Sequence, residues 1–167
     1  LVTGPVCLQT SHPRIHRIDV ESAAEMANQA QLYFQQADAG ILCAAVADFT
    51  PETTAGYKIK RENDDLTLRL KPTQDIAATL GRIKTAKQKL VGFALETNDE
   101  QHNAQSKLER KNFDFIVLNS LNDSGAGFRY DTNKISIIDR QGHTDYPLKS
   151  KPQVAQDIIN RLVEELQ

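Results

Sequence analysis

Cysteine, tryptophan and long apolar runs are scarce in this sequence, and each shortage excludes a class of protein. The 167 residues hold two cysteines, Cys7 and Cys43, and no tryptophan. Two cysteines without a close motif form neither a disulfide framework nor a zinc site, so we predict a reducing, cytoplasmic location. No apolar stretch approaches the roughly 18 residues that span a bilayer, so we expect no membrane partner.

A strong charge of either sign is also missing. Lysine and arginine total 20, aspartate and glutamate total 22, and the formal net charge is −2. This balance gives no general attraction to nucleic acid, so we expect no nucleic-acid partner and look for anion sites built from local cations. The length and the 40% hydrophobic content fit a single globular domain over residues 1–167.

Signature motifs of familiar nucleotide enzymes are absent as well. No glycine-rich loop ends in Gly-Lys-Ser or Gly-Lys-Thr, which counts against a P-loop site. Gly125-Ala126-Gly127 lacks the third glycine of a dinucleotide fingerprint. Arg61 stands four residues after Tyr57, where a short-chain reductase would have lysine. An NADP-dependent short-chain reductase is therefore the weaker alternative.

The hydrophobic pattern alternates between buried strands and amphipathic helices, which predicts an α/β fold. Continuous apolar runs, typical of strands buried on both faces, cover 39–46, 89–94 and 113–118, and we expect Cys43 to be buried in the first. We predict a mostly parallel sheet between two helix layers, which is a Rossmann-like three-layer αβα arrangement. Helices are expected over 19–37 (with Asp19 as the N-cap), 75–84, 98–112 and 152–167.

Some segments do not fit this alternation. Residues 134–138 and 143–148 resemble a hairpin around Gln141-Gly142, and 65–70 alternates as a half-exposed strand. We expect them to form a small antiparallel appendage used in dimerisation. The polar stretch 47–61 is a long loop of the kind that either covers a site as a lid or is disordered.

Cations of the predicted lid and of the helix over 98–112 are the candidate anion ligands. Lys58, Lys60 and Arg61 could close over an anion or form an ordinary solvated loop. Lys107 and Lys111 share one helix face, where they repel each other unless an anion lies between them, but they could equally complement the helix dipole. The phosphate interpretation gains only if this face meets the carboxyl ends of the strands, where open α/β sheets bind ligands.

A series of short motifs stands along the chain in a recognisable order and spacing. They are Ala44-Ala45-Val46-Ala47-Asp48-Phe49, Lys58-Ile59-Lys60, Lys71-Pro72-Thr73 with Asp75-Ile76, Gly92-Phe93-Ala94 with Glu96-Thr97, Lys107 through Lys111-Asn112, Asp114 and Asn119. This series resembles phosphopantothenoylcysteine synthetase, the phosphopantothenate–cysteine ligase family. The resemblance runs from Leu1 to the final helix.

The resemblance implies a homodimeric ligase of coenzyme A biosynthesis, often the C-terminal half of a bifunctional protein. In the implied reaction the carboxylate of 4′-phosphopantothenate attacks the α-phosphate of CTP, giving an acyl-cytidylate and pyrophosphate. The amine of cysteine then displaces CMP to form an amide. The resemblance implies CTP as co-substrate and Mg²⁺ or Mn²⁺, with metal ligands unknown, and FMN only if the parent protein has a decarboxylase half.

The resemblance also assigns roles to individual residues. Lys58 matches the flap lysine that helps catalysis by neutralising phosphate charge. Gln74 stands where the family usually has proline, so contacts around it are less certain. Ala44 and Ala45 match small residues that line the substrate site, and the nucleotide-binding positions are Asp48, Lys58, Thr73, Asp75, Ile76, Phe93, Lys107 and Lys111.

The start of the chain departs from the family. The family has an Arg-Ser-Ser-Gly stretch near its beginning, and an arginine and an asparagine there act on the acyl-cytidylate. This chain begins at Leu1 without a methionine and without that stretch. We expect an N-terminal truncation, and little or no activity from the isolated fragment. The alternative is a non-catalytic module that binds nucleotide or only dimerises.

Overall fold

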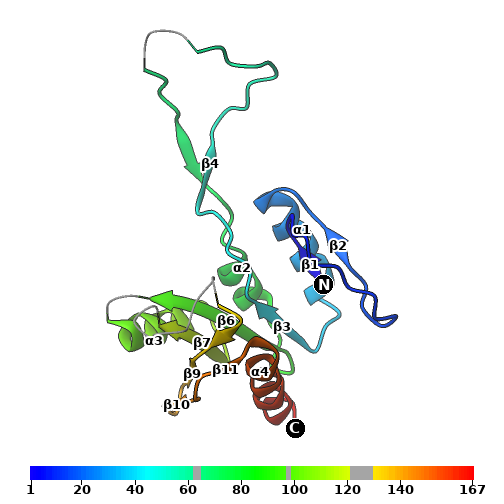
Figure 1. Cartoon of the computed structure of the whole chain (residues 1–167), viewed down its shortest axis with the longest axis vertical. Coiled ribbons are helices and arrows are strands. Elements are labelled where there is room, and N and C mark those ends of the chain that lie inside the picture. Colours follow the sequence, from blue (N-terminus) through cyan, green and yellow to red (C-terminus); the bar gives the residue numbers. More distant parts are fainter. Residues whose placement is uncertain (62–64, 97–98, 121–129) are drawn as a thin grey trace. The chain divides into compact units, whose positions relative to one another are not determined.

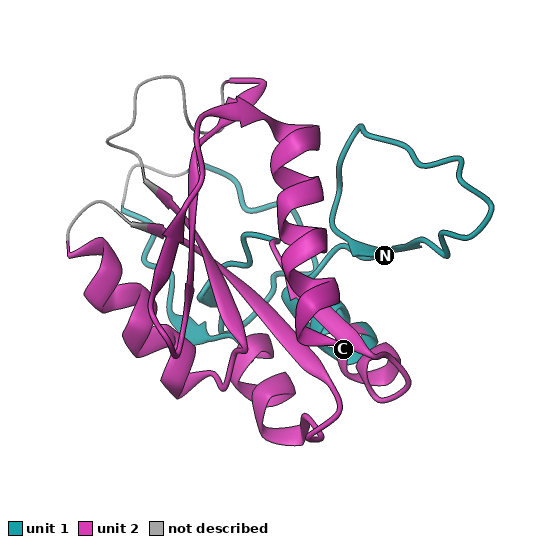
Figure 2. Ribbon diagram, turned by 90° about the horizontal axis from the view of Figure 1, so that it is seen from below, with its two compact units in different colours: residues 1–29, 44–75 teal, residues 30–43, 76–167 magenta. Residues whose placement is uncertain are grey.

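The computed structural model describes residues 1–61, 65–96, 99–120 and 130–167. The chain forms two compact units (Figure 2): unit 1 comprises residues 1–29 and 44–75, and unit 2 comprises residues 30–43 and 76–167. Among the helices of the described residues, none combines the length and the apolar character needed to cross a membrane.

A five-stranded sheet is the centre of unit 2 (Figure 1). In spatial order its strands are β10 (His143–Asp145), β9 (Ile135–Asp139), β7 (Phe115–Ser120), β6 (Lys89–Glu96) and β3 (Ala39–Leu42). Strands β3, β6 and β7 run parallel, whereas β9 is antiparallel to β7 and β10 is antiparallel to β9. The predicted α/β fold is confirmed.

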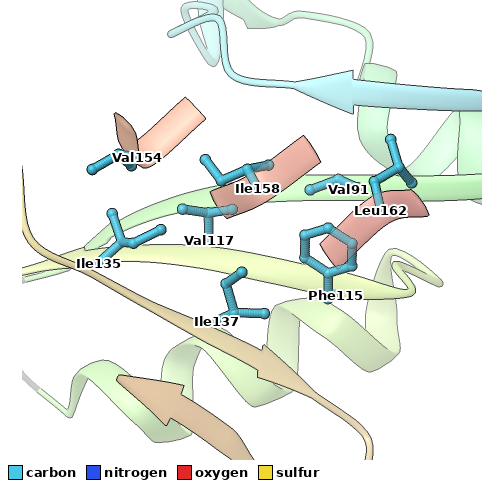
Figure 3. Packing of buried hydrophobic residues seen from close by; sticks show 8 residues of the cluster. All are labelled: Val91, Phe115, Val117, Ile135, Ile137, Val154, Ile158 and Leu162. Atoms are coloured by element: carbon cyan, nitrogen blue, oxygen red, sulfur yellow. The ribbon is translucent and has the colours of Figure 1, made fainter. Parts of the chain in front are cut away.

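One face of this sheet packs against helix α4 (Lys151–Glu165) (Figure 3). Val154, Ile158 and Leu162 recur at helical spacing and are buried. They meet alternate strand residues, because successive side chains of a strand point to opposite faces. The sheet contributes Val91, Phe115, Val117, Ile135 and Ile137. Just before α4, the short strand β11 (Lys149–Ser150) pairs antiparallel with β8 (Thr132–Asn133).

Helices α2 (Ile76–Ile83) and α3 (Glu100–Arg110) contact the sheet on its opposite face. The chain after α3 approaches α2 so closely that a Cβ on Gly81 would lie 2.0 Å from the carbonyl oxygen of Lys111. Asn112 adopts a positive φ of 53° and its Nδ2 donates to the Gly81 carbonyl at 2.9 Å. Residue 81 therefore has to be glycine for the two helices to keep this packing.

Asp114 joins three elements at the amino-terminal edge of the parallel strands. Its carboxylate accepts from the Lys84 ammonium at 2.7 Å and from the N–H of Leu90 at 2.6 Å. The Lys84 side chain is only 8% exposed. A charge-assisted pair of this kind ties the segment after α2 to the start of β6 and to the turn before β7.

Arg161 of α4 holds a second cluster of charges in unit 2. It pairs with Glu165 at 2.6 Å and with Asp139, at the end of β9, at 3.0 Å. Burial acts to raise the pKa of Asp139. The N–H groups of Gln141 and Gly142 and the Arg161 guanidinium outweigh burial, so the pKa of this carboxyl lies below its ordinary value.

Unit 1 contains two short strand pairs. Strands β1 (Val2–Thr3) and β2 (Ile18–Asp19) are parallel and precede helix α1 (Ala23–Phe34), whose last residues belong to unit 2. Strands β4 (Phe49–Pro51) and β5 (Leu70–Pro72) are antiparallel. The described residues between them, 52–61 and 65–69, are called the flap below (Figure 1).

The predicted start of the first helix is wrong. Asp19 lies in β2, and α1 begins only at Ala23. The side chain of Ser22 accepts from the N–H of Glu25 at 3.2 Å, and the Glu25 carboxylate accepts from the N–H of Ser22 at 3.0 Å. This reciprocal pair satisfies backbone donors that a helix start leaves open, so Ser22 caps the helix in place of Asp19.

Several predicted strands also differ from the structure. The strand expected over 39–46 ends at Leu42, and Cys43 is exposed instead of buried. The hairpin is part of the main sheet because β9 pairs with β7. The strand expected over 65–70 begins only at Leu70, and the side chains of Leu66 and Leu68 are 65% and 59% exposed. The described residues form two small antiparallel pairs outside the main sheet, β8–β11 and β4–β5, and the β4–β5 pair is called the appendage below.

Candidate functional site

The base of the flap brings two predicted nucleotide-binding residues together. The N–H of Thr73 donates to the carbonyl of Asp48 at 2.9 Å, and Oγ1 of Thr73 donates to the carbonyl of Ala47 at 2.7 Å. The β4–β5 ladder continues from this point toward the flap. The Asp48 side chain is exposed, so its carboxylate is accessible to a ribose hydroxyl or to a cation.

Lys58 lies in the flap, beyond the last backbone pair of the ladder. That pair joins the N–H of Glu52 to the carbonyl of Arg69 at 2.9 Å. The described residues between them form no helix or strand, and Lys58 is exposed together with Lys60 and Arg61. A segment whose described residues are exposed and extend beyond the ladder can bring cations to an anion without disturbing a packed core.

The carboxyl ends of β6 and β7 form the second candidate region. Phe93 is partly buried against the cluster beneath α4. Leu95 points to the same face two residues further along β6 and is 38% exposed. Leu95 stands opposite Asn119 in the ladder. Because open α/β sheets bind ligands outside the carboxyl ends of their strands, this edge offers an apolar surface beside an amide.

Helix α3 places its two lysines at different distances from that edge. Lys107 is in the last turn, and Lys111 is the C-cap, just before β7 begins at Phe115. Since α3 leads from the end of β6 to the start of β7, Lys111 lies at the amino-terminal edge, roughly 16 Å along the axis from the helix start. Lys107 lies four residues, or about one helical turn, nearer the carboxyl edge than Lys111, and helical side chains also tilt toward that N-terminal end of the helix.

The predicted site residues are divided between the two units. In unit 2, Phe93 lies on the face beneath α4 and Lys107 on the face of α3, so a ligand that touches both must cross the strand ends. The side chain of Ile76 is buried in α2, where it serves packing. Unit 1 holds Ala44, Ala45, Asp48, Lys58, Thr73 and Asp75, and unit 2 holds Ile76, Phe93, Lys107 and Lys111.

Metal-ligating groups and a cavity are two further features of the described residues that can be compared with the predicted site. Over residues 1–61, 65–96, 99–120 and 130–167, no three or more His, Cys, Asp or Glu side chains gather in a way that could hold a metal ion. A hollow of about 310 Å³ lies between α3 and the β9–β10 hairpin. It is lined by Gln101, His102, Gln105, Ile138, Gly142 and His143, which include no predicted site residue.

Sequence reasoning missed Asn133. Its Nδ2 donates to Oδ1 of Asn119 at 3.0 Å, and its own Oδ1 accepts from the N–H of Lys134 at 3.1 Å. Asn119 was visible in the sequence as a polar residue that ends an apolar strand. The signal that could have found its partner is the pairing of this strand with the strand after Lys134, which a hairpin prediction alone does not supply.

The family of the chain follows from comparison with known proteins. Residues 1–166 match the family described as DNA/pantothenate metabolism flavoprotein C-terminal domain. The chain belongs to this family. The Coenzyme A biosynthesis bifunctional protein CoaBC of Bacillus subtilis (strain 168) is 42% identical over 97% of this chain and 40% of its own length. Membership in the family confirms the resemblance that the sequence motifs indicate.

Two further relatives are a curated protein with a different name and a solved structure. A protein of an unknown prokaryotic organism, named Cysteine/Cysteine sulfinic acid decarboxylase, is 55% identical over 98% of this chain and 46% of its own length. The crystal structure of the C-terminal domain of CoaBC superposes with a TM-score of 0.80 and 31% identity, over 99% of this chain and 72% of that one. The chain thus spans less than half of these curated relatives.

Proposed function

We propose that this chain is the ligase domain that joins 4′-phosphopantothenate to cysteine with the use of CTP in coenzyme A biosynthesis. The observation that carries the proposal is the match of residues 1–166 to the pantothenate-metabolism family. The similarity to CoaBC proteins supports the same pathway. The family match also favours a ligase over the short-chain reductase alternative.

In the proposed reaction a carboxylate oxygen of 4′-phosphopantothenate forms a bond to the α-phosphorus of CTP, and the bond from that phosphorus to pyrophosphate breaks. The amine of cysteine then attacks the acyl carbon, loses a proton and releases CMP. Charge develops on the phosphate oxygens in the first step, so cations placed there stabilise its transition state. Lys58, on the exposed flap beside Lys60 and Arg61, is the proposed catalytic cation.

Nucleotide-contacting roles are proposed for residues of each unit taken by itself. Asp48, Thr73 and Asp75 would contact the nucleotide from the flap base, where the Thr73 hydrogen bonds support the Asp48 backbone. Phe93 and Lys107 would contact it at the carboxyl edge of the main sheet. Ala44 and Ala45 are exposed and small, which suits the close approach of a substrate. Ile76 and Lys111 have weaker geometric support.

The proposed divalent cation, Mg²⁺ or Mn²⁺, would bind together with the triphosphate. Mg²⁺ commonly keeps water and phosphate oxygens as ligands and takes only one or two carboxylates from the protein. The exposed carboxylates of Asp48 and Asp75 fit that role, and a closed protein cage is not required. FMN belongs to the proposal only for a parent protein that also has a decarboxylase half.

A homodimer is part of the proposal, and the exposure of the appendage supports it. Phe49 and Leu70 of the β4–β5 pair are 58% and 57% exposed. Tyr57 and Ile59 of the flap are 79% and 50% exposed. Burying apolar surface of this kind against a second copy of the chain would be favourable. The cytoplasmic location likewise remains a prediction.

Decarboxylation of cysteine or cysteine sulfinic acid is a second candidate, favoured by the name of the 55% identical relative. That name describes a whole protein, of which this chain spans 46%. A decarboxylase reaction in the rest of such a protein is consistent with a ligase reaction in this part. The two activities need different co-substrates, which makes them separable by experiment.

The test uses the full-length protein that contains this chain. It is incubated with 4′-phosphopantothenate, cysteine and CTP, with ATP as the control, and the amide, CMP and pyrophosphate are measured. CTP-dependent amide formation is the expected result, and its absence overturns the ligase proposal. Release of CO₂ from cysteine or cysteine sulfinic acid without CTP reports the second candidate. Binding of CTP to the full-length protein without turnover favours a non-catalytic nucleotide module.

A further inference from the structure

The amide pair of Asn119 and Asn133 has a fixed direction. A backbone N–H can only donate, so the N–H of Lys134 at 3.1 Å identifies the atom facing it as Oδ1 of Asn133. The amide nitrogen of Asn133 therefore faces Asn119. Because that nitrogen is also a donor, it selects Oδ1 of Asn119, which accepts at 3.0 Å. The main chain at Lys134 thus sets the orientation of both side-chain amides.

This orientation turns the Nδ2 group of Asn119 away from Asn133. No described residue accepts a hydrogen bond from that group, and Asn119 is only half-buried. Asn119 is the last residue but one of β7 and stands opposite Leu95 and Ile135 in the sheet. Its outward donor therefore lies at the carboxyl edge, on the face of the sheet that carries Phe93 and Leu95.

We propose that Asn119 is a pre-oriented hydrogen-bond donor that binds an acceptor atom of the nucleotide, with Asn133 as its positioning residue. This inference rests on the proposed function. An amide held by an internal partner loses little freedom on binding, so its hydrogen bond is stronger than that of a free side chain. The acceptor is an oxygen or ring nitrogen, supplied either by the base or by a phosphate.

The decisive substitution is Asn133→Asp, which leaves Asn119 itself unchanged. One carboxylate oxygen still accepts from the N–H of Lys134, but the other now requires a donor from Asn119. The Asn119 amide must turn over, so it presents Oδ1 instead of Nδ2 to the ligand. Asn119→Asp is the complementary variant, because it keeps the hydrogen bond from Asn133 and replaces only the outward donor with an acceptor.

Asn160→Asp is the matched control. Asn160 lies on the exposed side of α4, and its Oδ1 accepts from Gln156 at 2.8 Å. The substitution adds the same charge and keeps that acceptor. Thermal unfolding of all variants identifies any that fail to fold. If a variant does not fold, a second measurement on the wild-type protein replaces it: the NMR signals of the Asn119 side-chain N–H groups are followed during titration with CTP.

Titration calorimetry of the full-length protein with CTP, cytidine and tripolyphosphate gives the readout. We expect Asn133→Asp and Asn119→Asp to weaken CTP binding at least about tenfold, because each variant loses one well-placed hydrogen bond. Asn160→Asp should bind CTP with the affinity of the wild type. A parallel loss for cytidine assigns the contact to the nucleoside, and a loss for tripolyphosphate assigns it to a phosphate. Unchanged binding by both variants, or unmoved Asn119 signals, overturns the inference alone. A wild-type protein that does not bind CTP overturns the proposed nucleotide site as well.

Discussion

Thr73 and Asp48 are joined through their main chains, with the N–H of Thr73 2.9 Å from the carbonyl oxygen of Asp48. The Thr73 hydroxyl adds a second bond, to the carbonyl of Ala47 at 2.7 Å. These bonds close the β4–β5 ladder at the end opposite to the flap. The position of Lys58 relative to Asp48 therefore depends on a short ladder that Thr73 terminates.

Replacing Thr73 with valine should loosen this ladder while leaving the rest of the chain folded. Valine keeps the branched shape but removes the Oγ1 donor, so local opening should become easier by about 0.5–1.5 kcal/mol. Hydrogen exchange of the β4 and β5 amides should then rise about 2- to 10-fold. Thr73→Ser retains the hydroxyl and serves as the control. Equal exchange in both variants would show that the hydroxyl does not hold the flap base.

Gly81→Ala should destabilise unit 2 strongly for its size. The added methyl group would lie 2.0 Å from the carbonyl oxygen of Lys111, a main-chain atom that cannot move without shifting the end of α3. Overpacking of this kind costs about 1–3 kcal/mol. Gly56→Ala is the matched control, since a Cβ at that position would meet no described atom within 4 Å beyond the glycine and its two chain neighbours. Denaturant unfolding should separate the two variants, and equal midpoints would contradict the close packing described here.

Asp139 should make unit 2 sensitive to acid. Its pKa in the folded chain lies below the unfolded value of about 3.9, so the unfolded chain takes up the proton first as the pH falls. The stabilisation is complete above the unfolded pKa and is lost as the pH drops through the folded pKa. Asp139→Asn, which has no such proton to take up, should lose less stability between about pH 5 and pH 2. Parallel stability curves for the two proteins over that range would sink this prediction.

Local periodicity accounts for most of what the sequence predicted correctly. The apolar runs around Val91 and Val117 became buried strands, and the stripe of Val154, Ile158 and Leu162 became the buried face of α4. These patterns depend on neighbours within one element, so they are readable without the fold. The family motifs likewise depend on order along the chain.

Non-local pairing accounts for what the sequence did not reveal. The hairpin residues around Gln141 look the same whether they form an appendage or extend a sheet, and only the pairing of β9 with β7 decides. Asn119 and Asn133 meet for the same reason. Asp19 and Ser22 are both residue types that can cap the start of α1. The reciprocal hydrogen bonds between Ser22 and Glu25 favour Ser22.

In the proposed reaction, Lys58→Gln should slow formation of the acyl-cytidylate by the full-length protein about 10²–10³-fold, which is the usual cost of removing one charge-stabilising donor. Its effect on the affinity for CTP should be smaller, because the charge develops in the transition state. Single-turnover release of pyrophosphate measures the step directly. Lys60→Gln, two residues away on the same exposed flap, is the control. An equal loss in that variant would mean that the flap acts through its total charge, and an unchanged rate in Lys58→Gln would remove Lys58 from catalysis.

Lys107→Ala should weaken CTP binding more than Lys111→Ala, although both lysines lie on one face of α3. Lys107 stands one turn closer to the carboxyl edge, and helical side chains tilt toward that end of the helix. Lys111 is the C-cap at the amino-terminal edge, where its charge favours the helix end through the dipole. Calorimetric titration of the full-length variants should therefore show a fall in affinity for Lys107→Ala, and a lower unfolding temperature as the main effect of Lys111→Ala. The reverse order of affinities would place the nucleotide at the opposite edge of the sheet from the one argued here.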